Sequence, residues 1–374
     1  MKRAERRSVR IDRPMLSRTP EGRYRVSARV DGRAVGYESD ARLSPSAEAY
    51  LTAFLLPAMA RGLDLEIDAE VDATWLSRVE QVRRFVRATW TDYDGGEVRA
   101  SGMTHLEPAE RAVRAQFFGG GVDSLHLLHE LRTELGALVF AGGFDVPLTD
   151  PDRLAAVRQQ NGRIADRCGL RLLDVSTDLR SHPLYRRPSW LMLYGGALAS
   201  VGHLLQRHVR SCVVSGWGRI TPPLVHGSHP EIEPGWSSGA VAFAFRGGDL
   251  SRVEKVARIA DWSVFREHLR VCWEHRSPAL NCGQCEKCVR TRLELLAAGA
   301  LAGASTFPPG DLADAIDRIE GVTMPVIPFY RDLLQRIDDR RVCASLERLL
   351  ERGPPRRSRM RRLTRRLHRI LGNV

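Results

Sequence analysis

The sequence predicts an α/β protein in which a parallel sheet carries helices on both faces. Three observations lead to this prediction. Apolar, strand-like segments alternate with helix-like segments from about residue 112 to residue 216. Three consecutive glycines stand between the first of those strands and its helix. Four cysteines fall within seventeen residues further on, at Cys272, Cys282, Cys285 and Cys288.

Length and composition set the outer limits. A chain of 374 residues, 43% of them hydrophobic, is expected to form two or three domains and to bury a sizeable core. It contains no run of about 18 apolar residues, so no transmembrane helix is expected. The basic N-terminus has no apolar segment behind it and does not read as a secretory signal. We therefore expect a cytoplasmic protein.

The net charge of +12 is concentrated at the end of the chain. Residues 352–374 contain nine arginines and no acidic residue, and removing them from the total leaves +3 for the rest. Apolar residues at helical spacing within this stretch predict a basic amphipathic helix or a solvated tail. Contact with nucleic acid or with a membrane surface stays open. Nucleic acid is not favoured as a partner, because the remaining sequence offers no basic track.

Residues 1–110 predict a small α+β module. Its first fourteen residues read as a charged, mobile leader, and Asp31-Gly32 is a strong two-residue hairpin signal. No chemical motif occurs here, so we expect a structural or substrate-shaping role. The expected strands are 23–30, 34–37, 63–67 and 98–103, and the expected helices are 44–60 and 74–90.

Residues 111–305 predict the main α/β domain, followed by a helical region over 306–352 and the basic tail over 353–374. In such sheets ligands bind at the carboxyl ends of the strands. A long loop over 221–239 is a further binding candidate. The expected strands are 114–118, 138–142, 171–175 and 212–216, and the expected helices are 124–135, 152–168, 190–208, 252–262 and 289–298.

The glycine run Gly119-Gly120-Gly121 precedes Val122-Asp123-Ser124 and the start of a helix. Glycines let backbone N–H groups converge, and the helix adds its own unpaired N–H groups and the positive end of its dipole. Such a turn suits a phosphate. It is not a Walker A loop, since no Gly-Lys-Ser/Thr follows, and its third glycine is not spaced for a dinucleotide.

The four cysteines indicate a metal site. A disulfide framework is not expected in a chain of this size and compartment. Four thiolates can close a tetrahedral zinc site, and a [4Fe–4S] cluster or free buried thiols are the alternatives. Structural zinc contributes roughly 10–16 kcal/mol in finger peptides, which is comparable with the ~5–15 kcal/mol stability of a whole domain. Losing one thiolate is therefore expected to unfold this segment.

The stretch Gly119–Ser124 resembles the signature of the PP-loop ATP pyrophosphatase superfamily, Ser-Gly-Gly-x-Asp-Ser after an apolar strand. Gly119 stands in the place of the first serine, and Gly120, Gly121, Asp123 and Ser124 match. The resemblance implies that the loop grips the pyrophosphate of ATP and that chemistry occurs at the α-phosphate. It further implies that Ser124 and the loop stabilise the leaving pyrophosphate. Asp123 would place Mg²⁺, which prefers oxygen ligands.

Together with the cysteine segment, the chain resembles the 7-cyano-7-deazaguanine synthase family over residues 112–300. This resemblance rests on the glycine loop, the stretch 250–256 and the run Asn-Cys-Gly-x-Cys-x-Lys-Cys that ends at Cys288. The resemblance implies a ligase-type enzyme that adenylates a small-molecule carboxyl or amide. Ammonia or an amine then attacks the activated carbon. The oligomeric state stays open, with a homodimer as one possibility. Lys255 is expected to stabilise phosphate charge, and Trp217 to stack on the base.

Two other functions stay open. PP-loop proteins also activate RNA and tRNA bases, and a non-catalytic nucleotide-binding module would explain Gly119 as a mark of decay. Several polar residues at predicted strand ends or in the long loop are weaker candidates for contacts with nucleotide, substrate or metal. They are Asp145, Asp174, Asp178, Arg219, His226, His229 and Glu231.

Overall fold

The computed structural model describes residues 7–219, 225–323 and 326–355. The described chain divides into two compact units. The first contains residues up to Gly119 and Asp123–Leu250, and the second contains Gly120–Val122 and everything from Ser251 onward. The domain boundaries predicted from the sequence stay predictions.

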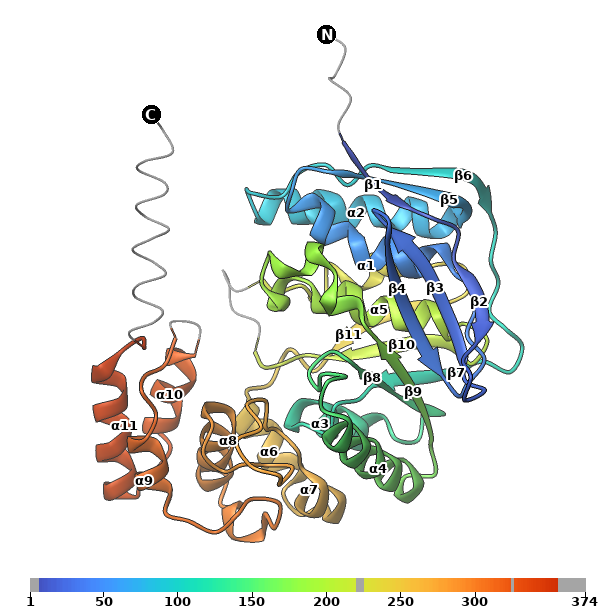
Figure 1. The fold of residues 1–374 in the computed structure, drawn as a ribbon. Coiled ribbons are helices and arrows are strands. Elements are labelled where there is room, and N and C mark those ends of the chain that lie inside the picture. Colours follow the sequence, from blue (N-terminus) through green and yellow to red (C-terminus); the bar gives the residue numbers. More distant parts are fainter. Residues whose placement is uncertain (1–6, 220–224, 324–325, 356–374) are drawn as a thin grey trace, which may run out of the picture. The chain divides into compact units, whose positions relative to one another are not determined.

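An eleven-stranded, mostly parallel sheet forms the framework of the first unit (Figure 1). Ten strands lie in the order β11-β10-β7-β8-β9-β4-β3-β1-β5-β6, and β2 pairs with β3. The strands are β1 (Ser8–Ile11), β2 (Met15–Arg18), β3 (Tyr24–Val30), β4 (Arg33–Ser39), β5 (Asp64–Asp72), β6 (Val98–Thr104), β7 (Val113–Phe117), β8 (Ala137–Gly142), β9 (Arg171–Thr177), β10 (Val209–Ser215) and β11 (Ala242–Arg246).

The five strands β7 to β11 are parallel to their neighbours, with β7 paired between β8 and β10. The α/β prediction is thereby confirmed at the level of a mostly parallel sheet with helices. Strand β11 was not predicted from the sequence. Its backbone pairs with β10 from Ser211↔Ala242 to Ser215↔Arg246, and it follows the long loop directly.

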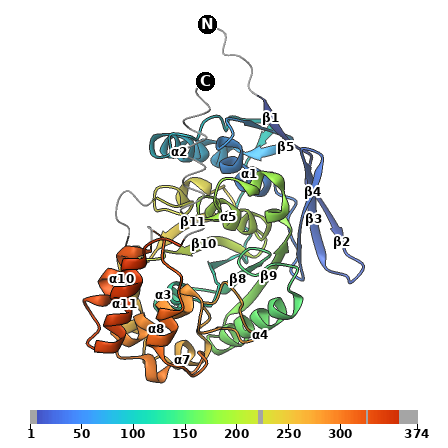
Figure 2. The ribbon, with the colours of Figure 1, turned by 60° about the vertical axis from the view of Figure 1, so that its left-hand side comes forward.

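The N-terminal strands belong to this same sheet, which the sequence did not reveal. Antiparallel pairing of β4 with β9, at Tyr37↔Thr177 and Glu38↔Ser176, makes the connection. The predicted hairpin at Asp31-Gly32 is confirmed, and both residues have positive φ angles of 47° and 75°. Figure 2 shows β2, β3 and β4 from a second direction.

The prediction of a charged leader over residues 1–14 was wrong for the described part. Ser8–Ile11 forms β1, which runs parallel to β5 from Ser8↔Asp64 to Ile11↔Ile67. Val9 and Ile11 are buried, so alternate apolar side chains enter the core. Ser8 and Arg10 at the intervening positions, within a strongly charged stretch, masked this period-two pattern.

Helices cover both faces of the sheet in the first unit. Helix α4 (Pro151–Arg167) packs on β8 and β9, and α5 (Tyr194–Leu204) packs on α1 (Ala47–Met59) and β10. Adjacent residues of β9 show the two faces: Ser176 accepts from Arg158 of α4, whereas the Thr177 hydroxyl lies beside Tyr37, which bonds to Ser200 of α5. The helices are α1 (Ala47–Met59), α2 (Ala73–Thr89), α3 (Val122–Leu131), α4 (Pro151–Arg167) and α5 (Tyr194–Leu204).

Two of these helices begin as their caps dictate. Ser46 accepts the Ala49 N–H at the start of α1, and Asp150 accepts the Arg153 N–H at the start of α4. Helix α5 is shorter than the predicted 190–208, because residues 190–192 form a separate 3₁₀ turn and α5 ends at Leu204. That turn leaves Trp190 outside the helix.

The second unit is helical apart from its cysteine segment. Its helices are α6 (Arg252–Ile259), α7 (Ser263–His268), α8 (Glu286–Ala297), α9 (Leu312–Asp317), α10 (Ile327–Leu334) and α11 (Arg340–Arg352). Valines, leucines and isoleucines of α6, α8, α9, α10 and α11 form one apolar core. A buried ion pair joins α6 to α8, since Arg252 Nε lies 2.9 Å and 3.1 Å from the two carboxylate oxygens of Glu294.

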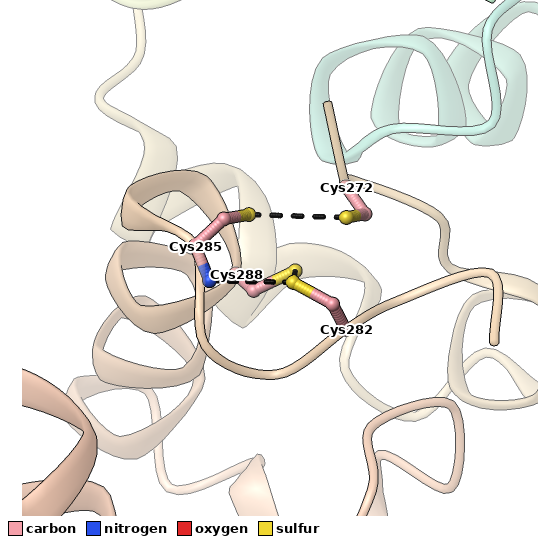
Figure 3. Close-up of side chains that lie close together, drawn as sticks. All are labelled: Cys272, Cys282, Cys285 and Cys288. Carbon is pink, nitrogen blue, oxygen red and sulfur yellow. Dashed lines mark hydrogen bonds between the residues drawn. The ribbon is translucent and has the colours of Figure 1, made fainter. Parts of the chain in front are cut away.

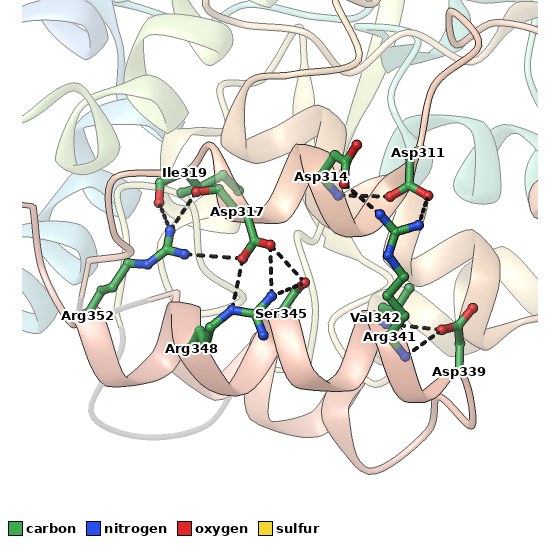
Figure 4. A network of polar contacts seen from close by, with 10 residues as sticks. All are labelled: Asp311, Asp314, Asp317, Ile319, Asp339, Arg341, Val342, Ser345, Arg348 and Arg352. Carbon is green, nitrogen blue, oxygen red and sulfur yellow. Dashed lines mark hydrogen bonds and ion pairs between the residues drawn. The ribbon is translucent and has the colours of Figure 1, made fainter.

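A polar clamp holds α9 against α11 (Figure 4). The Asp317 carboxylate accepts hydrogen bonds from Arg348 at 2.8 Å, Arg352 at 3.2 Å and Ser345 at 3.2 Å. Arg341 reaches Asp311 at 2.7 Å and Asp314 at 2.8 Å from the other end of the helix. These arginines therefore fasten the two helices to one another.

The basic tail beyond residue 355, with the amphipathic helix predicted there, lies outside the described residues. Among the residues that the structure describes, no helix is both long enough and apolar enough to cross a membrane.

Candidate functional site

The glycine turn joins β7 to α3 at the carboxyl end of β7. The Phe118 N–H donates to Val139 O at 2.8 Å, which extends the pairing of this strand with β8 up to the turn. Helix α3 then starts at Val122 and buries Leu125 and Leu128. A strand, a glycine turn and a helix N-terminus therefore follow one another as the sequence predicted. This is the arrangement that leaves backbone N–H groups available to an anion.

The three glycines have different structural requirements. Gly120 has a φ of 75°, where a side chain would be strained, and its carbonyl accepts the Arg270 N–H at 2.8 Å. Gly121 has room for a Cβ in ordinary contact, 3.7 Å from Arg270 O. Gly119 has open space around its Cβ position and no positive φ. The serine that the PP-loop signature has at this position could therefore replace Gly119 without strain.

Asp123 and Ser124 lie in the first turn of α3. Ser124 is buried, and its carbonyl accepts a 2.7 Å hydrogen bond from Gln116 Nε2 of β7. Gln116 is itself fully buried, so this bond fixes the first turn of α3 to the strand that precedes it. The backbone of Ser124 is thus fixed to β7.

Tyr194, the first residue of α5, lies within electrostatic reach of both Asp123 and Asp145. Burial raises the pKa of Tyr194 above its usual range, and the carboxylates of Glu233, Asp123 and Asp145 raise that pKa further. The side chain of Asp145, which follows β8, is exposed. The structure therefore gathers strand-end groups from two neighbouring strands around one tyrosine, which the sequence did not single out.

Glu233 is the most unusual charged residue of the first unit. Its side chain is fully buried, and neither carboxylate oxygen has a hydrogen-bond partner among the described residues. Burial raises the pKa of Glu233 to about 8, and the nearby Ser228 hydroxyl opposes that rise. Ser228 does not reach hydrogen-bond geometry with Glu233. Uncompensated buried carboxyl groups are costly and concentrate at functional sites.

Several sequence candidates have other partners. Trp217 already stacks on His226, with ring centroids 4.6 Å apart and planes 19° apart. His229 stacks on Phe85, and its Nδ1 accepts the backbone N–H of Glu231. The histidine and glutamate candidates of the long loop do not form a metal cluster among the described residues.

Asp174 and Asp178 hold the N-terminal strands and are not free for metal or ribose. Asp174 pairs with Arg158 at 2.8 Å and with Arg23 at 3.6 Å. Asp178 accepts the Gly36 N–H at 2.9 Å. Asp174 therefore lies within β9 and binds arginines of α4 and of the segment before β3, whereas Asp178 follows β9 and binds the backbone of β4.

Lys255 belongs to the second unit, on α6. Its side chain is almost completely buried, which makes it one of the largest side chains removed from solvent. A capping box of Ser251 and Glu254 fixes the start of this helix, because each side chain bonds to the other residue's backbone N–H. The position of Lys255 is thus rigid within its own unit.

Cys272, Cys282, Cys285 and Cys288 form the clearest site in the described structure (Figure 3). All four are buried, and their sulfur atoms lie within 4.8 Å of one another. Two pairs are 3.9 Å apart, Cys272–Cys285 and Cys282–Cys288. A tetrahedron with metal–sulfur bonds of about 2.3 Å has edges of about 3.8 Å. The four thiols therefore fit a single metal ion of the size of zinc.

The local fold explains this convergence. Cys285 is the N-cap of α8 and Cys288 lies in its first turn, while Cys282 precedes a turn at Gly283. Gly283 has a φ of 71°, and a Cβ there would meet Pro308 at 2.8 Å, so glycine is required. Arg292 donates to Gly283 O at 3.4 Å and supports the turn from α8.

Asn281 is a structural contributor whose role the sequence analysis did not identify. Its fully buried side chain accepts the backbone N–H groups of Val271 at 2.8 Å and Cys272 at 3.3 Å. It donates to Leu269 O at 2.8 Å and to Thr306 O at 3.2 Å. Because Asn281 adjoins Cys282, it fixes the segment of Cys272 against the segment of the other three cysteines.

The thiols influence each other strongly. Hydrogen bonds from Cys285 and Cys288 lower the pKa of Cys272, and donating to Cys272 raises the pKa of Cys288. One thiolate is therefore stabilised by its neighbours, but four buried thiolates need a cation to neutralise them. A divalent metal ion supplies that charge.

A hollow of about 430 Å³ lies over the first residues of β7, β10 and β11, between Arg114, Arg210 and Ala242. It is at the amino ends of these strands, whereas the glycine turn follows the carboxyl end of β7. The hollow is thus separate from the residues that carry the predicted chemistry.

Comparison of the chain with family models, curated proteins and solved structures gives no match.

Proposed function

We propose that the chain is an ATP-dependent adenylating enzyme of the PP-loop type, similar to 7-cyano-7-deazaguanine synthase. The observation that carries the proposal is the turn from β7 to α3. There Gly120 requires its positive φ, and Asp123 and Ser124 occupy the first turn of a helix at the carboxyl end of a parallel strand. Such a turn suits the phosphates of a nucleotide.

The reaction would have two steps. A carboxylate oxygen of the substrate attacks the α-phosphorus of ATP, the bond between the α-phosphorus and its bridging oxygen breaks, and pyrophosphate leaves with the bond electrons. Ammonia or an amine then attacks the acyl carbon of the adenylate, loses a proton and expels AMP. The loop N–H groups and the Ser124 hydroxyl would stabilise the pyrophosphate as it leaves.

Two metal ions are part of this proposal. Asp123 would hold Mg²⁺, which lowers the charge of the phosphates, because carboxylate oxygens are its preferred protein ligands. The four cysteines would hold Zn²⁺ in a structural role, since all four positions of a tetrahedron would be filled by protein. Lys255 would interact with phosphate charge.

Product identification tests this proposal. Purified protein is incubated with ATP, Mg²⁺, an ammonium salt and a panel of planar acids that includes 7-carboxy-7-deazaguanine, and nucleotides are identified by mass. AMP with pyrophosphate is the expected result. ADP with phosphate would exclude adenylation at the α-phosphate. ATP binding without turnover on any acid would favour a non-catalytic module, and turnover only with tRNA would favour RNA modification.

A further inference from the structure

The loop over residues 227–236, called the Glu233 loop below, buries oxygen atoms that no described hydrogen-bond donor satisfies. Glu233 is 0% exposed, and Ser228 is buried as well. Neither carboxylate oxygen of Glu233 nor the Ser228 hydroxyl has a hydrogen-bond partner among the described residues. A buried polar atom without a partner is costly, and a buried unpaired charge costs most. A group that neutralises this carboxylate would therefore stabilise the folded chain.

Two glycines bring the Glu233 loop against the start of α5. The Gly227 N–H donates to Leu191 O at 2.8 Å, and a Cβ on Gly227 would lie 2.3 Å from Met192 O. A Cβ on Gly195 would lie 2.1 Å from Gly227 O and 2.9 Å from Glu233 Oε1. Both approaches are too close for a real side chain, so these positions require glycine. The loop backbone and the Glu233 carboxylate therefore lie against the first turn of α5.

The oxygens of this region are close enough together to share one ion. Gly227 O and Glu233 Oε1 lie at most 5.0 Å apart, the sum of their distances from the Cβ position of Gly195. Two oxygens that bind the same hard cation, at metal–oxygen distances of about 2.3–2.6 Å, lie at most about 5.2 Å apart. The separation of the carbonyl and the carboxylate is thus within the span of a single ion.

The Ser228 hydroxyl adds a third oxygen. Burial raises the pKa of Glu233, and the Ser228 hydroxyl opposes that rise, so it lies near the carboxylate. The same hydroxyl opposes the rise that burial and Glu233 cause in the pKa of Tyr194. A carboxylate, a backbone carbonyl and a hydroxyl are the ligand types that hard cations prefer.

The charge of the site favours a monovalent ion. Burial and Ser228 set the pKa of Glu233, and no arginine, lysine or histidine among the described residues contributes to it. His203 of α5 and Arg78 of α2 reach the Glu233 loop, but they bind the carbonyls of Trp236 and Pro234. One carboxylate among neutral oxygens is balanced by a single positive charge. A divalent ion would leave a buried positive charge without a partner.

We propose that the Glu233 carboxylate, Gly227 O and the Ser228 hydroxyl bind one monovalent cation, such as Na⁺ or K⁺, which fastens the Glu233 loop to the start of α5. This site does not depend on the adenylation reaction. A proton is the competing occupant, because the protonated carboxyl group is neutral without a cation. Without the cation the pKa of Glu233 is about 8, so cation binding should tighten as the pH rises towards that value.

Thermal unfolding of the full chain at pH 9 tests the site. The buffer contains tetramethylammonium chloride, whose cation is too large to be bound by these oxygens, and NaCl or KCl replaces it at constant ionic strength. At about ten times its dissociation constant, the bound cation should raise the unfolding midpoint by about 3–6 °C. The shift should saturate with cation concentration. Glu233→Gln should remove it, whereas Glu231→Gln, an exposed neighbour in the same loop, should keep it.

Proton release gives a second readout that does not depend on stability. At pH 7 Glu233 is mostly protonated without the cation, so adding Na⁺ or K⁺ should release close to one proton per chain. A pH-indicator dye in weak buffer measures this release. At about pH 10 no proton should be released, and Glu233→Gln should release none at either pH. The stability of Glu233→Gln is also compared in tetramethylammonium buffer, because a bound cation would reduce its difference from the unaltered protein.

Ser228→Ala tests the oxygen set without removing the charge. The Ser228 hydroxyl has no hydrogen-bond partner among the described residues, so the variant should fold with undiminished stability in tetramethylammonium buffer. The loss of one oxygen ligand should weaken cation binding at least about fivefold.

Three outcomes would overturn the site. The first is the absence of any midpoint shift with either cation at pH 9, which would mean that a proton alone neutralises Glu233. The second is an equal shift in Glu233→Gln, which would identify a general effect of salt. The third is unchanged cation affinity in Ser228→Ala, which would contradict the proposed ligands.

Discussion

Replacing the buried Glu233 with glutamine should stabilise the protein, and more so as the pH rises. The neutral carboxyl form of Glu233 resembles glutamine, so the two proteins should have similar stability at low pH. Above the ordinary pKa of 4.5 the unfolded chain loses this proton, whereas the folded protein keeps it until a pKa of about 8. Over that interval the folded protein binds more protons than the unfolded chain, so the stability of the unaltered protein falls as pH rises.

The size of the effect follows from those two pKa values. They differ by about 3.5 units, and each unit corresponds to about 1.36 kcal/mol, which gives about 5 kcal/mol at pH 8 and above. The Glu233 oxygen Oε1 lies 2.9 Å from the Cβ position of Gly195, at the positive N-terminus of α5. The positive end of this helix can stabilise the charged form of Glu233 by up to about 2 kcal/mol, which reduces the expected effect by that amount. We therefore expect a stabilisation of about 3–5 kcal/mol.

Thermal unfolding of Glu233→Gln and of the unaltered protein at pH 5, 7 and 9 measures this difference. For a unit of this size about 1 kcal/mol shifts the midpoint by about 2–4 °C, so the two curves should separate by roughly 6–20 °C at pH 9. At pH 5, where ionisation of the unfolded chain contributes about 1 kcal/mol, they should separate by only about 2–4 °C. Glu231→Gln, an exposed neighbour in the same loop, should show no pH-dependent gain. A constant difference at all three pH values would refute the reasoning. Loss of activity together with the gain in stability would mark Glu233 as functional.

Three further predictions concern the other sites. Cys285→Ser should abolish metal binding and unfold the second unit, as metal analysis and circular dichroism would show. Cys343→Ser is the control and should keep the metal content. Equal metal content in both variants would contradict a four-cysteine site. Gly119→Ser should leave ATP affinity unchanged or raise it. Gly120→Ala should weaken ATP binding, because a residue with a side chain costs about 1–3 kcal/mol at a positive φ. A large loss of ATP affinity in Gly119→Ser would contradict the interpretation of this turn as a nucleotide-binding loop. Asp317→Asn should lower the unfolding free energy of the second unit by only about 1 kcal/mol, since its arginine partners are partly exposed, and a loss above about 3 kcal/mol by chemical denaturation would contradict this.

The sequence predicted those parts of the fold that are determined by residues close together in the chain. Alternating strands and helices predicted the parallel core, because each apolar strand is followed by its own helix along the chain. Asp31-Gly32 predicted its hairpin for the same reason, since two residues with positive φ decide that turn. The four cysteines predicted a cluster because the spacing of three of them places them around one turn and the start of α8.

Other features depend on contacts that local patterns do not encode. Strand β1 is short and lies in a strongly charged stretch, and only its pairing with β5 shows that Val9 enters the core. Asp174 reads as a strand-end ligand until the pairing of β4 with β9 brings Arg23 to it. Glu233 reads as an ordinary loop residue, because burial without a partner is a property of the folded chain.

Isotope transfer tests adenylation most directly. The acid that supports AMP formation is prepared with ¹⁸O in its carboxylate, and AMP is recovered after turnover with ATP, Mg²⁺ and ammonia. If the carboxylate attacks the α-phosphorus, the AMP carries one ¹⁸O and is two mass units heavier. Asp123→Asn should form this labelled AMP at least a hundredfold more slowly, because Mg²⁺ would lose its ligand. Unlabelled AMP, or label retained in the acyl product alone, would contradict the proposed reaction.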